Sequence, residues 1–251
     1  MTIFGGILLY LSLIGCGVSF ISLLKPVWFL GIRTRKRGLR VLGFSLLFFA
    51  AGVYLPVSET NVDAVLWHLD EFAPEYQFSE FHSVLIHASK DRVDGAIRTV
   101  TPPEIRFYRT LTWMRRFGRP SPSGVLNPAR DRPILETFTH GVPLADNPGQ
   151  EIVFGFGGVP YGKKLRPEEF KSPVPAGSIK IAMNFRIQEL DAAHCRLTTE
   201  TRVYAVGFHV VHGFATYWRM IYPGSSLIRH MWLHAIKLRA EGAEVIRSPS
   251  V

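Results

Sequence analysis

Two long hydrophobic runs occupy the first 57 residues of the chain. The first run, residues 3–24, holds 22 residues without a charged side chain. As an α-helix it would be about 33 Å long, enough to cross a hydrocarbon core of ~30 Å. The second run, residues 41–55, reaches 15 residues before Pro56. We therefore predict a transmembrane hairpin over residues 1–57, with helices at about 3–24 and 41–56.

The segment between the two runs is strongly basic. It holds six basic residues and no acidic one, namely Lys25, Arg33, Arg35, Lys36, Arg37 and Arg40. By contrast, residues 41–89 contain no Lys or Arg. Because basic loops stay on the cytoplasmic side of a membrane, this asymmetry predicts a cytoplasmic hairpin loop and an extracytoplasmic domain after Pro56. The second run is short for a span and would need a snorkelling Arg40 or a locally thinned bilayer.

Two other interpretations of the first run fit less well. A cleaved signal peptide carries its positive charge before the hydrophobic run, whereas here the charge follows it. Residues 13–16 match the short bacterial lipoprotein pattern that ends in an acylated cysteine, here Cys16. Cleavage there would leave residues 17–24 as an apolar stub and place the basic loop outside, so the sequence favours a packing role for Cys16.

The rest of the chain has the alternating pattern of an α+β domain. Residues 58–80 are expected to form a juxtamembrane connector, with a short helix or connecting segment near residues 61–72. Candidate strands follow at residues 81–88, 134–144, 150–157, 178–190 and 195–206. Candidate helices lie at residues 90–98, capped by Ser89, and at residues 104–117, after two prolines that suit a first turn.

Breaker residues divide the remaining segments. Residues 118–132 are rich in Pro, Gly, Ser and Asn and are expected to form a surface loop. Near the end, helices at residues 208–222 and 225–241 are separated by Pro223 and Gly224, which should break or kink the run. Residues 242–251 are expected to form a flexible tail.

Two of the candidate strands indicate which side chains share a face. Apolar residues occupy the odd positions from residue 179 to residue 187, and polar residues alternate with them. The partner strand alternates in the same way. An antiparallel register that joins the apolar faces gathers a polar cluster on the opposite face, made of Asn184, Arg186, Glu200 and Arg202. This cluster is either a surface salt-bridge ladder, the more common arrangement, or a set of ligand-anchoring groups.

Charge and cysteine content exclude some classes of function. The chain has a net charge of +9, and its last part, from Lys90 onward, carries 23 basic and 14 acidic residues in a dispersed pattern. Without a basic stripe or a known binding module, a nucleic-acid partner is not expected. Attraction to anionic lipid headgroups and a merely solvated surface both remain open. The two cysteines, Cys16 and Cys195, cannot build a disulfide framework.

Motifs at both ends of the domain resemble a known superfamily. Residues 74–82, the strand that follows and the helix after Ser89 resemble the opening of START-like domains, also called Bet v 1-like or SRPBCC domains. Residues 184–186, 199–203 and 217–225 are similar to a bacterial SRPBCC subgroup without an assigned function. The resemblance spans about residues 72–241, and we assign the domain to residues 81–241. It implies a helix-grip fold, in which a curved antiparallel sheet grips a long C-terminal helix.

The resemblance also implies an apolar cavity for lipids, sterols, polyketides or similar ligands. On that fold the cavity-lining side chains would come from the strands and the terminal helix, namely Phe154, Phe156, Ile181, Met183, Phe185, Val203, Phe214, Tyr217 and Trp218. The same residue types build a filled core equally well. The hairpin and Pro223 depart from the superfamily pattern and argue against a freely diffusing lipid shuttle.

Catalytic and metal-binding patterns are weak. His209 with His212, and His230 with His234, have helical spacings, but no carboxylate or cysteine completes a metal site. The glycines at residues 155–158 lack the Lys-Ser or Lys-Thr pair of a phosphate loop, and no serine elbow motif occurs. The sequence therefore predicts no metal and no cofactor, and it gives no positive support for an enzyme.

These features together predict a multi-pass protein of the bacterial inner membrane. Its extracytoplasmic START-like domain would bind a hydrophobic or amphipathic ligand, with membrane lipids as partners and the oligomeric state not predicted. The first alternative is an enzyme of the same fold, such as a cyclase or hydrolase of apolar substrates, which a buried cavity acid or histidine such as Glu200 or His212 would favour. The second is an envelope interaction or structural protein, which would show a large exposed apolar patch.

Overall fold

The computed structural model describes residues 2–25, 31–32, 34–116, 118–119, 127, 132–138, 141–158 and 165–242. Its contacts divide the chain into two compact units. The first unit contains Met1–Ser58 and Phe208–Tyr222, and the second contains Glu59–Gly207 and Pro223–Val251. The loop expected at residues 118–132 and the tail expected at residues 242–251 lie almost wholly outside the described residues.

The first unit begins with two apolar helices. Helix α1 spans Thr2–Leu24, as predicted, but helix α2 spans Arg35–Tyr54 and so begins before the predicted residue 41. The Thr34 side chain caps α2 by accepting a hydrogen bond from the Arg37 amide at 3.3 Å, and Arg and Lys are good helix formers. With 20 residues, α2 is about 30 Å long. Both helices are therefore long and apolar enough to cross a membrane.

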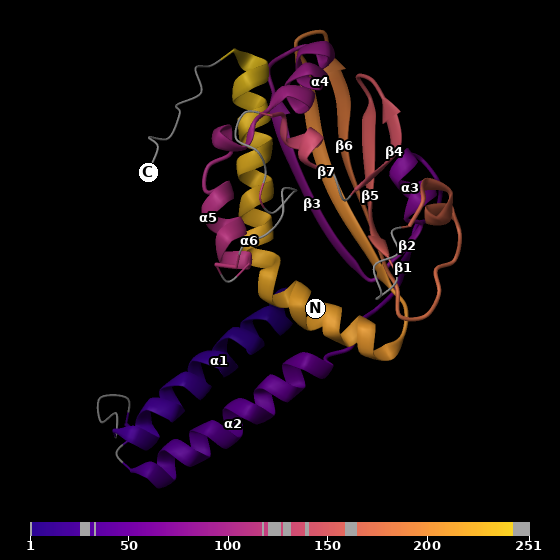
Figure 1. The fold of residues 1–251 in the computed structure, drawn as a ribbon. Coiled ribbons are helices and arrows are strands. Elements are labelled where there is room, and N and C mark those ends of the chain that lie inside the picture. Colours follow the sequence, from indigo (N-terminus) through magenta and orange to yellow (C-terminus); the bar gives the residue numbers. More distant parts are fainter. Residues whose placement is uncertain are drawn as a thin grey trace. The chain divides into compact units, whose positions relative to one another are not determined.

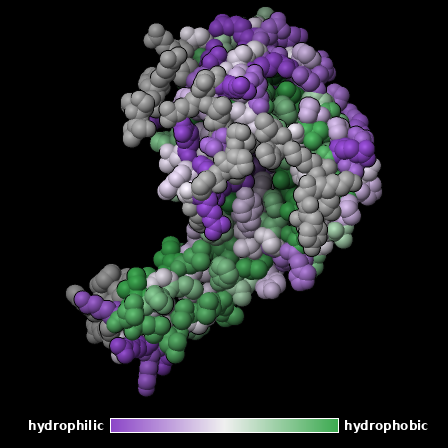
Figure 2. Space-filling view, in the orientation of Figure 1, coloured by the Kyte–Doolittle hydropathy of each residue, from purple (hydrophilic) through white to green (hydrophobic). Residues whose placement is uncertain are grey.

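Helices α1 and α2 pack through small residues and turn large apolar ones outward. The buried positions between them are small, as at Ser12, Ser19, Ser22, Gly38, Ser45 and Gly52. A Cβ added to Gly52 would come within 2.9 Å of Leu9 Cδ2, so this glycine permits a close approach. Phe20 and Leu47, in contrast, are mostly exposed. Figure 2 shows hydrophobic residues covering this hairpin, the reverse of the pattern in a water-soluble helix pair.

The second unit contains a five-stranded antiparallel sheet in the order β3–β7–β6–β5–β4 (Figure 1). Its strands are β3 (Phe78–Ile86), β4 (Val142–Asn147), β5 (Glu151–Gly158), β6 (Ile179–Asp191) and β7 (His194–Ala205). The predicted pairing of the two longest strands is confirmed, since β6 runs antiparallel to β7 with Ile181 opposite Val203. A separate small sheet joins β1 (Thr60–Asn61) to β2 (Glu75–Tyr76).

Helices pack on both faces of the five-stranded sheet. The short helical segments are α3 (His68–Phe72), α4 (Lys90–Thr99), η2 (Pro102–Glu104), α5 (Tyr108–Arg115), η3 (Ile134–Thr137) and η4 (Pro167–Lys171). The last helix, α6, spans Phe208–Glu241. Its residues 223–241 pack on the face that we call the inner face, whereas α3 and η4 pack on the outer face.

The largest hydrophobic cluster lies between the inner face and α6. Strand alternation brings Ile86 of β3, Phe154 of β5 and Phe185 of β6 to this face, where they meet Trp232 and Ile236 of α6. A second, smaller cluster lies under α3 and η4 on the outer face. The curved antiparallel sheet and the C-terminal helix against it confirm the predicted α+β helix-grip fold, preceded by two apolar helices.

The expected connector at residues 58–80 differs in the structure. It contains β1, β2, α3 and the first residues of β3, and it belongs to the sheet unit. The reason is burial, because Leu69, Phe72 and Phe78 are all covered by the sheet unit and cannot lie in a solvated linker.

Three further segments also differ from expectation. The strand expected at residues 134–144 is instead η3 followed by β4, whose pairing with β5 begins only at Val142. The helix expected at residues 104–117 is shorter, as η2 and α5. The two final helices form one continuous α6 with Pro223 inside it, and the boundary between the two units falls at that proline.

Candidate functional site

The inner face carries a group of polar side chains amid its apolar cluster. Glu80 and His82 of β3 alternate with exposed residues, so they point to the inner face with Phe78 and Ile86. The β3–β7 register sets Glu80 opposite Thr201 and His82 opposite Thr199. All four are buried, and Glu80 is only 3% exposed. We call these residues, with Ser225 and Arg229 of α6, the inner polar cluster.

The carboxylate of Glu80 is held on both oxygens. His82 donates from Nε2 to Glu80 Oε1 at 2.9 Å, and Ser225 donates from Oγ to Glu80 Oε2 at 2.8 Å. The His82 ring also meets the His230 ring edge-on, with ring centres 4.4 Å apart. These contacts tie the edge strand β3 to α6 through a buried carboxyl group.

Arg229 reaches from α6 to strand β7. Its Nη2 donates to Thr201 Oγ1 at 2.7 Å and its Nη1 to Thr199 Oγ1 at 3.3 Å. Burial lowers the pKa of Arg229 from its usual value, and the charge of Glu80 opposes that shift. The guanidinium remains cationic at neutral pH. The Arg229 side chain thus places a cation between α6 and the sheet. Its direct hydrogen-bond partners are the neutral hydroxyls of the two threonines.

Trp232 adds an unusual donor beside this cluster. The Arg229 guanidinium lies 5.8 Å from the centre of the Trp232 ring, and that ring packs against Phe185 and Phe138. Its Nε1 is buried and has no hydrogen-bond partner among the residues that the structure describes. Buried indole N–H groups usually have a partner, so this donor is an exception on the inner face.

A groove opens along the free edge of β3, next to this cluster. It has a volume of about 300 Å³ and is lined by Ser83, Val84, Arg106, His230, Met231, Leu233 and His234. Val84, Met231 and Leu233 also belong to, or pack against, the inner hydrophobic cluster. His230 lines the groove and contacts His82, so the groove leads toward the inner polar cluster. Its volume is at the lower end of the range for ligand sites.

The predicted cavity residues fall into two groups. Phe154, Met183 and Phe185 are buried in the inner cluster and Phe156 packs against it. By register, Ile181 and Val203 share that face. The remaining three, Phe214, Tyr217 and Trp218, lie in the first unit, so the sheet unit does not contain them. A role for any of the nine in ligand binding stays a prediction.

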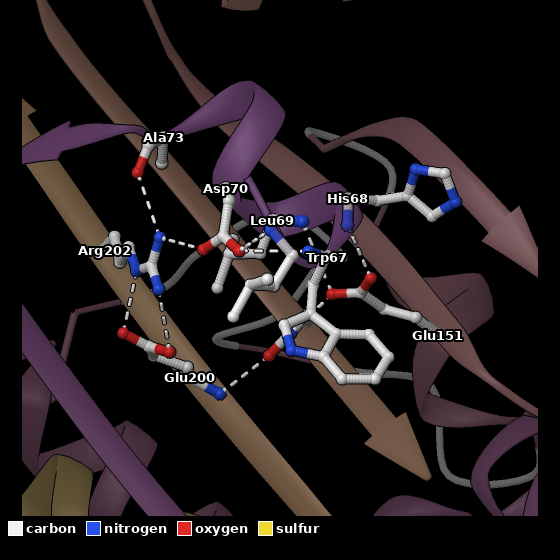
Figure 3. Close-up of polar contacts among 10 residues, drawn as sticks. Trp67, His68, Leu69, Asp70, Ala73, Glu151, Glu200 and Arg202 are labelled. Carbon is white, nitrogen blue, oxygen red and sulfur yellow. Dashed lines mark hydrogen bonds and ion pairs between the residues drawn. The ribbon is translucent and has the colours of Figure 1, made fainter. Parts of the chain in front are cut away.

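The predicted polar cluster lies on the opposite, outer face. Asn184 pairs with Glu200 across the β6–β7 ladder, and the cluster is covered by α3, as Figure 3 shows for Arg202 and Glu200. Arg202 Nη1 donates to Asp70 Oδ1 at 2.8 Å and to the Ala73 carbonyl at 3.2 Å. Its Nε donates to Glu200 Oε1 at 2.7 Å. With Arg202 only 8% exposed, the expectation of a surface ladder is wrong.

Glu151 and Asn184 complete this outer network. Glu151 accepts hydrogen bonds from the His68 amide at 2.8 Å and from Asn184 Nδ2 at 2.6 Å. Asn184 Oδ1 accepts from the Glu200 amide at 2.9 Å. Arg186, the fourth predicted member, instead lies over the Trp67 ring at 4.3 Å. The outer network therefore fixes the start of α3 on the sheet.

The ionisation of Asp70 reflects this packing. Burial alone would raise its pKa, but the Leu66 and Trp67 amides and the Arg202 guanidinium donate hydrogen bonds to the carboxylate. Together they outweigh burial and hold the pKa of Asp70 below its usual value.

Sequence reasoning missed the inner polar cluster, although a signal was present. Glu80 and His82 occupy the same alternate positions as the apolar Phe78, Val84 and Ile86, although the positions between them are of mixed character. Polar residues on the apolar side of a strand indicate either a buried pair or a site. Because the predicted strand begins at residue 81, its alternation leaves out Glu80. Metal binding has no support in the described part of the chain, where no group of three or more His, Cys, Asp or Glu could hold an ion.

Comparison with known proteins gives similarity at the level of structure alone. No family model matches the chain, and no curated protein matches it. A hypothetical protein of Helicobacter pylori is 14% identical, with a TM-score of 0.38 over 72% of this chain and 98% of its own. The Zhui aromatase/cyclase of a Streptomyces species is 12% identical, with a TM-score of 0.28 over 67% and 99%.

A third similar structure, of a protein from Thermus thermophilus, is 10% identical, with a TM-score of 0.28 over 66% of this chain and 99% of its own. With TM-scores below 0.5, these similarities add no argument about ligand or reaction. The helix-grip fold therefore rests on the sheet order and the packing of α6.

Proposed function

We propose that this protein binds a hydrophobic or amphipathic ligand between the inner face and α6, while its hairpin holds it in a membrane. The observation that carries the proposal is the inner polar cluster. Arg229, Glu80 and His82 form a small convergent set of polar groups within an apolar interior, beside a groove that reaches the surface. Ligand sites combine an apolar lining with a few such groups that fix orientation.

The polar end of the ligand would lie at Arg229. The guanidinium has donors beyond those that bind Thr199 and Thr201, and the Trp232 N–H beside it lacks an acceptor in the described chain. The apolar part would lie along Phe154, Met183 and Phe185 or replace some of their contacts. The ligand would enter through the groove at the edge of β3.

The membrane tether rests on helices α1 and α2. Both are long enough to span, and their large apolar side chains face outward. The basic residues between them favour a cytoplasmic loop, so the sheet unit would face the extracytoplasmic side of a bacterial inner membrane. A lipid of the adjacent leaflet is then the nearest ligand of suitable chemistry.

Ligand retention by full-length protein tests the proposal. The protein in detergent would be incubated with total bacterial lipid extract and examined by native mass spectrometry. We expect one tightly held lipid, retained at least fivefold less by Arg229→Gln and normally by Arg92→Gln, a matched change at an exposed arginine of α4. Equal retention by all three proteins, or no retained lipid, would contradict the proposal, because lipid around the hairpin does not depend on Arg229.

The orientation has its own test. Alkaline phosphatase fused after residue 251 is active only outside the cytoplasm, and a fluorescent protein of the green type matures only inside. We expect an active phosphatase and a dark fluorescent fusion. The opposite result would place the domain in the cytoplasm.

An enzyme is the second candidate, and one observation favours it. The hydrogen bond between Glu80 and His82 is the arrangement in which a carboxylate orients an imidazole for proton transfer. If this pair is catalytic, lipid bound to the wild-type protein will change mass over time, and lipid bound to Glu80→Gln will not. Unchanged ligand mass in both proteins would leave binding as the function.

A further inference from the structure

The first half of α6, residues 208–222, has an unusual composition for a segment at the surface of a protein. Arg219 is its only Lys, Arg, Asp or Glu in 15 residues, and five residues are aromatic, namely Phe208, Phe214, Tyr217, Trp218 and Tyr222. Phe208 is 61% exposed and Tyr217 is 41% exposed. A helical segment with so few charges and so many aromatic residues is typical of the boundary between lipid headgroups and acyl chains.

Arg219 joins this segment to the end of α2. Its Nη1 donates to the Gly52 carbonyl at 2.7 Å and to the Val53 carbonyl at 3.4 Å, and its Nη2 donates to the Leu55 carbonyl at 3.2 Å. The last carbonyls of a helix have no partner within the helix and carry partial negative charge. A guanidinium that is only 3% exposed here satisfies them directly.

Helix α1 approaches the same point of α6. A Cβ added to Gly5 would lie 2.8 Å from Arg219 Nε, and one added to Gly6 would lie 3.2 Å from the Arg219 carbonyl. In a regular α-helix the Arg219 carbonyl would accept a hydrogen bond from the N–H of residue 223. Pro223 has no N–H, so this bond is missing. Tyr10 donates its hydroxyl proton to the Met220 carbonyl. The beginning of α1 and the end of α2 thus hold residues 208–222 through backbone carbonyls on both sides.

These contacts fix the depth of the segment along the hairpin. If the hairpin spans a membrane as proposed above, the end of α2 and the start of α1 are the ends that leave the hydrocarbon core on the side away from the basic loop. Polar backbone groups at that depth must be satisfied by protein, as Arg219 does here. A helix bound at this level lies among lipid headgroups.

We propose that residues 208–222 form a membrane-surface helix, with Phe208 and Tyr217 in contact with lipid on opposite sides of the helix and Arg219 binding the segment to the hairpin. The proposal rests on the membrane tether proposed above and adds a lipid contact made by the sheet-gripping helix itself. Since α6 is continuous, one helix would contact lipid through its first half and cover the ligand site through its second half.

Spin labels on the full-length protein in lipid nanodiscs test this proposal. With Cys16 and Cys195 replaced by alanine, single cysteines would be placed at Phe208, Tyr217, Phe20 and Leu227. Phe20 is an outward residue of α1, and Leu227 is a similarly exposed residue of α6 beyond Pro223. Collision with oxygen, which dissolves in lipid, is compared with collision with a nickel chelate, which stays in water.

We expect oxygen to dominate at Phe20, Phe208 and Tyr217, and the nickel chelate to dominate at Leu227. If Phe20 is lipid-exposed but Tyr217 matches Leu227, the surface helix is wrong while the tether stands. If Phe20 also matches Leu227, the tether itself is wrong. A label at Tyr217 that is shielded from both reagents would indicate contact with a second copy of the protein and would likewise contradict the proposal.

The role of Arg219 is tested in the same samples. We expect Arg219→Gln to raise the mobility of the label at Tyr217 at least twofold and leave the label at Phe20 unchanged. Arg219→Lys, which keeps one donor group, should restore part of the immobilisation. Unchanged mobility at Tyr217 in Arg219→Gln would show that this arginine does not hold the segment.

Discussion

The two faces of the five-stranded sheet each carry an arginine that is covered by a helix, fully buried at Arg202 and half-buried at Arg229, and the two arginines have different surroundings. On the outer face, Arg202 forms ion pairs with Asp70 and Glu200 and is also bonded to the Ala73 carbonyl. On the inner face, Arg229 is bonded to two threonine hydroxyls, next to a groove and an indole donor without an acceptor in the described chain. The comparison indicates that the outer arginine stabilises the fold, whereas the inner one is the group that the proposed ligand would meet.

Removing the outer arginine should have the largest effect on stability. Arg202→Met leaves the carboxylates of Asp70 and Glu200 without their partner, which we expect to cost about 3–5 kcal/mol of unfolding free energy. Denaturant unfolding of the full-length protein in detergent measures this change. A loss below about 1 kcal/mol would mean that the outer network does not stabilise the fold as its geometry indicates.

Glu151 should have the next largest effect. Glu151→Ala removes the acceptor for the His68 amide and for Asn184 Nδ2, both on the outer face. Leaving buried donors unsatisfied costs about 1–3 kcal/mol, so we expect a loss near 2 kcal/mol. Glu168→Ala, at an exposed position of η4, is the control and should change stability by less than about 0.5 kcal/mol.

Low pH should destabilise the folded protein by protonating Asp70 on the outer face. Since the folded protein lowers the pKa of this carboxyl below its usual value of 3.8, the ionised form stabilises the fold at every pH above that value. That contribution is lost as the pH falls from about 3.8 through the lower pKa of the folded state. Unfolding free energy measured from pH 5 to pH 2 should therefore fall less steeply for Asp70→Asn than for the wild type. Parallel curves would contradict this role for Asp70.

The inner arginine should have the smallest effect on stability. Arg229→Met replaces a half-buried cation with an apolar side chain of similar length. Because the direct hydrogen-bond partners of Arg229 are neutral hydroxyls, the change breaks no direct ion pair, and we expect a loss of about 1 kcal/mol. Lipid retention by the same variant should nevertheless fall at least fivefold. If Arg229→Met destabilises the protein as strongly as Arg202→Met, the two faces do not differ in the way proposed.

The sequence predicts the features of this fold that depend on local pattern. The charge-free run predicts helix α1. The alternation along β6 and β7 predicts their antiparallel register and which side chains share each face of the sheet. It does not predict which polar face is covered, because α3 reaches Asn184 and Arg202 from more than 100 residues away in the chain. The prediction misses the start of α2 because its first turn is basic, and hydropathy alone does not show the cap at Thr34.

The candidate site was less predictable than the fold. Arg229 and Ser225 lie on α6, and their spacing alone does not indicate a site. They become part of a polar cluster only in the folded protein, where β3 places Glu80 and His82 against this part of α6. The aromatic residues near Trp218 are expected in the cavity only if the whole terminal helix packs on one surface. The division of α6 at Pro223 assigns them to a different compact unit from the strands of the inner face.

That division has a consequence for making the protein in the laboratory. Deleting residues 1–58 would remove the backbone carbonyls of Gly52, Val53 and Leu55, which accept hydrogen bonds from Arg219. Residues 208–222 would remain attached to the sheet unit through the continuous chain. In the shortened chain, α6 would carry an arginine without the carbonyls that it binds and an aromatic segment without the hairpin against which it packs. Such a truncation should self-associate, and detergent would be needed even for a chain from which both apolar N-terminal helices are gone.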